Sequence, residues 1–194
     1  GDFAFRGNLL SAVLAAATVM VLFWAILPLC RWIKPDASPN VAVTSAALGS
    51  AVFATAPLFW SQAVITEVYT LNALFVAALL LVAGRATLTE PAYGGSFQKN
   101  LVLFGFLLGI GLGNHLTLLA VAAPLLYWVG STAGWRRMAS VPAMAGFLAG
   151  FSVYLYLPIA ASQHPAISWG NTASAQGFVW QLSGRAYQDL VFGV

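Results

Sequence analysis

The stretch LVLFGFLLGIGLGNHLTLLAVAAPLLYWVG, residues 101–130, decides the fold because it contains no Asp, Glu, Lys or Arg. As one straight helix it would measure about 45 Å, at about 1.5 Å per residue. The hydrocarbon core of a bilayer is only about 30 Å thick. The stretch is therefore too long for one upright span and too short for two full ones. Asn114 and His115 lie near its centre.

The positive charges of the chain indicate how this stretch is folded. Basic residues in short loops favour the cytoplasmic side of a membrane. They follow the first, third and long apolar runs, as the pairs Arg31 and Lys34, Arg85 and Lys99, and Arg136 and Arg137. All three pairs share one side only if the long run enters the membrane and returns. We therefore expect two short helices, roughly 101–113 and 116–130, meeting at Gly113-Asn114-His115 near the external side.

The remaining apolar runs complete a membrane protein made only of helices. They cover residues 8–30, 41–60 (interrupted by Pro57), 68–83 and 138–159, and a span needs about 20 mostly apolar residues. We expect an all-α, polytopic transmembrane helix bundle of about six membrane helices, including the two short ones. Residues 1–160 would form the transmembrane domain and residues 161–194 an external segment.

The composition supports this class and excludes others. Of the 194 residues 60% are hydrophobic and 7% are charged, whereas a soluble domain has about a quarter charged residues. The net charge of +3 comes from few, scattered basic residues, so we expect no nucleic-acid partner and a lipid bilayer instead. One cysteine and two histidines exclude an internal disulfide, and we predict no metal site from residues of this chain.

The two ends of the sequence predict a piece of a longer membrane protein. The chain starts with Gly and shows no basic leader before a small-residue cleavage site. It stops within the apolar phrase YQDLVFGV, without a helix-stop signal.

The same topology brings polar residues from four parts of the sequence to the external side. They are Arg6 and Asn8, then Gln62 and Glu67, then Asn114 and His115, and finally His164, Trp169 and Asn171. Polar groups at membrane depth usually face a cavity or a partner, so we favour a role in a site for Asn114 and His115 over structural hydrogen bonding between helices.

Two neighbouring motifs have a structural and a functional interpretation. Glu67 could simply favour the start of a helix, but it lies close in sequence to Gln62, Tyr69 and Asn72, and the last two share a helix face. The WGN phrase that contains Trp169 and Asn171 could be a turn in an interfacial aromatic belt or could contact a sugar. Gly105, Gly109 and Gly113, spaced by four, predict close helix packing and not a phosphate loop.

Four phrases in order carry a family resemblance over nearly the whole chain. They are FRGNLLSAVLAA (5–16), FWSQAVITEVYTLNALF (59–75), GFLLGIGLGNHLTLLAVAAP (105–124) and YLYLPIAASQHPAISWGN (154–171). With them the chain resembles a membrane family, long labelled as a domain of unknown function, that is related to the transmembrane protein 260 type of protein O-mannosyltransferase.

The resemblance implies a glycosyltransferase of the polytopic GT-C class. Such an enzyme would transfer a sugar, commonly mannose, from a polyprenyl-phosphate donor to a hydroxyl group of an exported protein on the external face. It implies an integral protein of the bacterial inner (plasma) membrane, with the active site facing outside. No other cofactor is indicated, and a divalent metal has no support in the sequence.

The resemblance also implies which parts are missing. The catalytic carboxylate of this class lies in the first external loop, so the general base would precede residue 1, and the fragment alone would be inactive. An Arg expected near Ala160 or Ala161 is absent.

Supporting catalytic candidates are Glu67 and His115, with Arg185 as a further helper at the leaving phosphate. The substrate-binding candidates are Arg6, Asn8, Gln62, Tyr69, Asn72, Asn114, Trp169 and Asn171.

Two other functions remain open at this point. A component of a lipid or solute transporter or flippase would also have broken helices with polar residues at the break, but only one such break is evident. A non-catalytic membrane scaffold would lack the first external loop with its catalytic carboxylate.

Overall fold

The protein is seen in a computed structural model that describes residues 2–88, 94–165, 170–185 and 188. Every regular element in these ranges is a helix, which confirms the all-α prediction. The chain divides into two compact units, Gly1–Gly150 and Phe151–Val194. The predicted role of residues 161–194 as an external segment stays a prediction.

The first unit is an antiparallel series of helices, and side chains cap the starts of the first two. The Asp2 side chain accepts a hydrogen bond from the backbone N–H of Ala4 at the start of the first helix, and the Ser38 side chain caps the second. The helices are α1 (Phe3–Ile33), α2 (Pro39–Thr55), α3 (Pro57–Ala63), α4 (Tyr69–Leu88), α5 (Gly94–Asn114), α6 (Leu118–Val129), a π-helical turn (Gly130–Gly134), α7 (Trp135–Met138) and α8 (Val141–Phe151).

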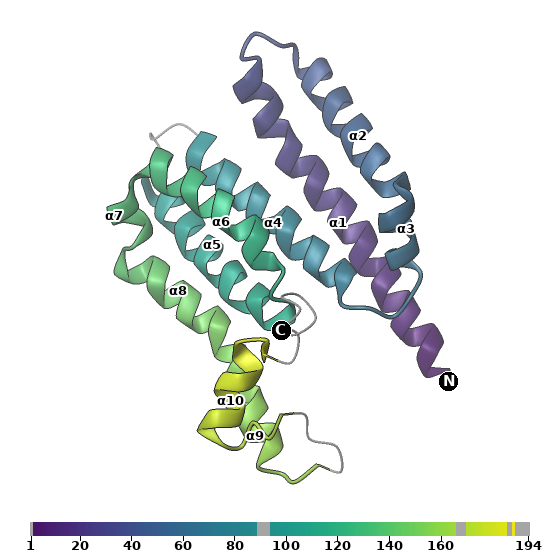
Figure 1. Cartoon of the computed structure of the whole chain (residues 1–194). Coiled ribbons are helices and arrows are strands. Elements are labelled where there is room, and N and C mark those ends of the chain that lie inside the picture. The colour runs from purple at the N-terminus through teal and green to yellow at the C-terminus, as the bar shows by residue number, and fades with distance from the viewer. Residues whose placement is uncertain (1, 89–93, 166–169, 186–187, 189–194) are drawn as a thin grey trace. The chain divides into compact units, whose positions relative to one another are not determined.

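Helices α1 and α4 run parallel to each other (Figure 1). At one end Gly7 of α1 faces the side chain of Thr66, just before α4. At the other end Gly84 of α4 lies against the ring of Pro28 in α1. On its other side α4 packs against α5 and α6, where Leu79, Leu101, Leu118 and Val129 are fully buried.

The charge-free stretch does fold back on itself. Helix α5 ends at Asn114 and α6 begins at Leu118, so the predicted break at Asn114 and His115 is confirmed. The start of α5 and the segment that follows α6 lie side by side, because the Gln98 amide donates to Ser140 Oγ over 3.1 Å. The guanidinium of Arg137 also lies 5.6 Å from the centre of the Phe97 ring.

Helices extend further than the apolar runs that predicted them. Helix α5 begins at Gly94 and α4 continues to Leu88, whereas the apolar runs that predicted them end at residue 83 and begin at residue 101. Residues 94–100 contain no proline, so nothing breaks the backbone hydrogen bonds where the apolar run stops. A helix can thus continue beyond the hydrocarbon layer.

Among the described residues four helices are long and apolar enough to cross a membrane, or five if a bent pair counts as one span. The four are Phe3–Ile33, Tyr69–Leu88, Leu118–Met138 and Val141–Ala161, and the bent pair is α2 with α3, at 67°. The bend lies where Pro57 was expected to interrupt the run. Helix α5, included among the predicted six, is absent from this group because Gln98, Lys99 and Asn100 occupy its first turns.

Close approach of α5 and α8 depends on glycine. A methyl group on Gly105 would lie 2.5 Å from the carbonyl oxygen of Ala143, which confirms the predicted packing role of this residue. Gly146 and Gly150 of α8 face the backbone carbonyls of Val102 and Phe106. These two glycines let α8 approach α5 closely, as Gly105 does from the side of α5.

The second unit contains a 3-10 turn (Ser152–Leu155), α9 (Tyr156–Ala161) and α10 (Ala175–Leu182). A turn with positive φ at Gly170 (73°) and Asn171 (47°) precedes α10. The hydroxyl of Thr172 donates to the carbonyl of Leu157 over 3.2 Å and ties this turn to α9.

Candidate functional site

The start of α1 is joined to the connection between α3 and α4. The Thr66 hydroxyl donates to Asn8 Oδ1 over 2.7 Å. Gly7, one residue earlier, has no side chain, and a methyl group there would collide with the Thr66 side chain. The glycine therefore lets the connection approach α1 closely enough for this hydrogen bond.

The start of α4 is joined in the same way to the break between α5 and α6. The Asn114 amide donates to the Val68 carbonyl over 3.3 Å. The Asn72 amide donates to Thr117 Oγ1, also over 3.3 Å. Two side chains thus fix the break against the first turn of α4, about 45 residues away in sequence.

The contacts of His115 Nδ1 indicate which ring nitrogen carries a proton. The backbone N–H of Thr117 donates to His115 Nδ1 over 3.2 Å, and Thr117 Oγ1 lies 2.8 Å from the same nitrogen. Nδ1 accepts from this N–H, so we assign the ring proton to Nε2. The ring centres of His115 and Tyr69 are 5.7 Å apart. The imidazole can thus offer an N–H donor beside a phenol.

We call this cluster the polar end of the bundle; in Figure 1 the N-terminus, the α3–α4 connection and the α5–α6 connection lie at the same end of the first unit. It consists of Asn8, Thr66, Tyr69, Asn72, Asn114, His115 and Thr117.

Several buried oxygen atoms around the polar end have no partner among the described residues. They are Gln62 Oε1, Thr70 Oγ1 and Asn72 Oδ1. Leaving a buried polar group unsatisfied costs about 1–3 kcal/mol. This part of the bundle therefore keeps unused hydrogen-bonding capacity that a polar ligand or ordered water would satisfy.

The structure brings together some of the predicted site residues. Asn8, Tyr69, Asn72, Asn114 and His115 belong to the polar end. Two others, Arg6 and Glu67, are exposed and adjoin the contact between Asn8 and Thr66 in sequence. Half-buried Gln62 lies in α3, where its amide makes a long contact of 3.5 Å with Ser61 Oγ.

The predicted residues in the tail are not placed with these. Asn171 and exposed Arg185 belong to the second unit, so their convergence with the polar end stays a prediction. Trp169 lies outside the described residues.

Two threonines of the polar end were missed by the sequence analysis. Thr66 bonds Asn8, and Thr117 links Asn72 to His115. A signal existed for Thr117, because a Thr two residues after a helix-breaking polar pair is a common start of the next helix.

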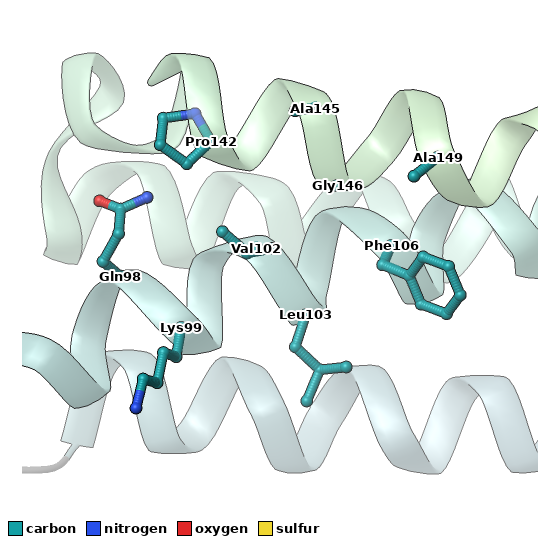
Figure 2. Close-up of a pocket in the computed structure, with 9 residues that line it drawn as sticks. All are labelled: Gln98, Lys99, Val102, Leu103, Phe106, Pro142, Ala145, Gly146 and Ala149. Atoms are coloured by element: carbon teal, nitrogen blue, oxygen red, sulfur yellow. The ribbon is translucent and has the colours of Figure 1, made fainter.

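The described residues of the polar end form no cluster of metal-binding side chains. Within the described ranges no three His, Cys, Asp or Glu side chains lie close enough to hold a metal ion. A groove of about 620 Å³ lies elsewhere, between α5 and α8 (Figure 2). The chemistry available at the polar end is therefore hydrogen bonding by amides, hydroxyls and one imidazole.

Comparison with known proteins gives one consistent result. Residues 1–139 match the family described as the protein O-mannosyl-transferase TMEM260 N-terminal domain. Over 97% of its length the chain is 27% identical to protein O-mannosyl-transferase tmem260 of Dictyostelium discoideum, and over 96% it is 24% identical to the Mus musculus protein of that name. It spans about a quarter of the length of each, 25% and 26%. No solved structure matches significantly.

Proposed function

Because this chain belongs to the family of the protein O-mannosyl-transferase TMEM260 N-terminal domain, we propose that it forms part of a GT-C type membrane mannosyltransferase. The donor is a polyprenyl-phosphate-linked mannose, and the acceptor is a hydroxyl group of an exported protein. The names of the two relatives support the sugar. Helices able to span a membrane support a lipid-linked donor.

The observation that carries the proposal is the polar end itself. It combines His115 with amides from α1, α4 and α5 at one end of helices that are otherwise apolar. The basic residues Lys99 and Arg137 lie at the opposite end of α5, so the positive-inside rule turns the polar end outward. An externally facing site is where a sugar is transferred to an exported protein.

Each residue of the polar end would have a separate role in sugar transfer. When the sugar leaves its lipid carrier, negative charge grows on the phosphate, and preorganised donors stabilise it. His115 supplies Nε2–H for this purpose; Thr117 holds the ring through Nδ1, and the Asn72 amide in turn holds the Thr117 hydroxyl. Arg6 adds a positive charge two residues before Asn8, whose side chain is bonded to Thr66. Glu67 orients the acceptor. We assign no residue of this chain the role of general base.

The test is sugar transfer by the full-length protein in proteoliposomes, using radiolabelled polyprenyl-phosphate mannose and a Ser/Thr acceptor peptide. His115→Ala should lower the transfer rate about a hundredfold, the cost of losing one preorganised donor. Asn40→Ala, at an exposed position in the first turn of α2, is the matched control and should leave the rate unchanged. A folded His115→Ala protein with undiminished transfer would refute the role of His115.

One observation favours a transporter as the second candidate. Besides the break at Asn114 and His115, the chain bends by 67° between α2 and α3, and paired broken helices are typical of transporters. The same proteoliposomes separate the two functions. A transporter would move the lipid-linked sugar across the bilayer and leave the acceptor peptide unmodified.

A further inference from the structure

An open groove of about 620 Å³ runs between α5 and α8 (Figure 2). Its volume falls within the range of about 300–1,000 Å³ that is usual for ligand sites. It is lined by Gln98, Lys99, Val102, Leu103, Phe106, Pro142, Ala145, Gly146 and Ala149. Only the first two of these carry polar side chains, and both lie at the start of α5.

The spacing of the lining residues shows why a groove forms. On α5 Lys99, Leu103 and Phe106 recur every three or four residues and so share one face. On α8 the facing positions are occupied by Ala145 and Ala149. Glycines draw the two backbones close together, so the alanine side chains leave a channel beside the larger side chains of α5.

One end of this channel is positively charged. Exposed Lys99 lines it. Arg137 adds a charge at the same end of α5, where its guanidinium lies 5.6 Å from the centre of the Phe97 ring. The sequences of α5, α7 and α8 contain Lys99, Arg136 and Arg137 but no Asp or Glu. The groove therefore combines an apolar channel with a cationic end, and the described helices α5, α7 and α8 carry no acidic side chain that would neutralise Lys99.

We propose that this groove binds an anionic phospholipid of the leaflet at the basic end of the bundle. One acyl chain lies along Val102, Phe106 and Ala145, and the phosphate is held by Lys99. Basic pockets between membrane helices on the cytoplasmic side recognise anionic headgroups in this way. A second copy of the chain fits less well, because two such basic ends would repel each other.

The proposed lipid site is separate from the polar end. Lys99 and Asn114 are 15 residues apart on α5, which corresponds to about 22 Å along the helix axis. The proposal does not depend on the proposed transferase activity.

The experiment is native mass spectrometry of the purified chain in detergent, titrated with dioleoylphosphatidylglycerol or dioleoylphosphatidylcholine. The unmodified chain should bind the anionic lipid several-fold more tightly. Lys99→Gln should reduce this preference about fivefold, as expected for one basic residue near an anionic lipid surface. Lys34→Gln removes an exposed charge outside the groove and should leave the preference unchanged.

A second pair of variants tests the channel. Ala145→Trp fills the groove and should weaken binding of both lipids, whereas Ala47→Trp, at an exposed position on α2, should not. Circular dichroism confirms that each variant is folded; if Ala145→Trp is not, the lysine pair decides alone. Equal lipid preference in Lys99→Gln and the unmodified chain would overturn the proposal. So would a dimer that Ala145→Trp abolishes, which would identify a second copy as the occupant.

Discussion

Replacing Gly105 by Ala should lower the free energy of unfolding, and the contacts of the new methyl group give the direction and magnitude of this change. The new methyl group would lie 2.5 Å from the carbonyl oxygen of Ala143 and 3.1 Å from the backbone N of Phe147. Both neighbours are backbone atoms of α8, so no side chain can rotate away. Ordinary contact needs about 3.4 Å, so α8 would have to move outward by about 0.9 Å.

A matched substitution isolates this effect. In Gly84→Ala the methyl group would lie 3.6 Å from Pro28 Cγ, an ordinary contact. Both variants gain about 1 kcal/mol from the higher helix propensity of Ala, but only Gly105→Ala incurs the overpacking cost of about 1–3 kcal/mol. We expect the two variants to differ in free energy of unfolding by about 2 kcal/mol, with Gly84→Ala the more stable.

Thermal unfolding in detergent micelles, followed by circular dichroism at 222 nm, measures the difference. About 2 kcal/mol corresponds to roughly 4–8 °C in Tm for a chain of this size. If Gly105→Ala unfolds at the same temperature as Gly84→Ala or above it, α5 and α8 do not pack through glycine as described.

Three further predictions concern the break and the bend. Thr117→Val should lower the free energy of unfolding by about 1–2 kcal/mol, because Asn72 and His115 both lose a partner; Thr44→Val on α2, where the side chain is exposed, should change little in the same denaturant titration. In a Cys30→Ala background, Lys99→Cys and Arg136→Cys should react with an impermeant maleimide from one side of the membrane and Asn114→Cys from the other; labelling of Lys99→Cys and Arg136→Cys from opposite sides would contradict the fold-back. Pro57→Ala should reduce the 67° bend between α2 and α3 and lengthen the distance between spin labels at positions 43 and 61 in double electron–electron resonance; an unchanged distance would show that the bend does not depend on the proline.

The break in the long apolar stretch could be predicted from the sequence because membrane thickness and charge placement act on the chain directly. A length of about 45 Å does not fit one crossing, and Lys99 and Arg137 could share a side only through a return. The limits of α4 and α5 could not be predicted from hydropathy, because a helix continues beyond its apolar run where no proline stops it.

The sequence alone determined that this is a helical membrane protein with a polar break at Asn114 and His115, since hydropathy, charge and length are properties of consecutive residues. Only the tertiary structure decided which distant side chains meet there: Thr66 with Asn8, and Thr117 with Asn72. It also decided that Gly146 faces the backbone of Val102. Such pairings depend on how far each helix is rotated and shifted against its neighbours, and close packing of side chains sets those quantities.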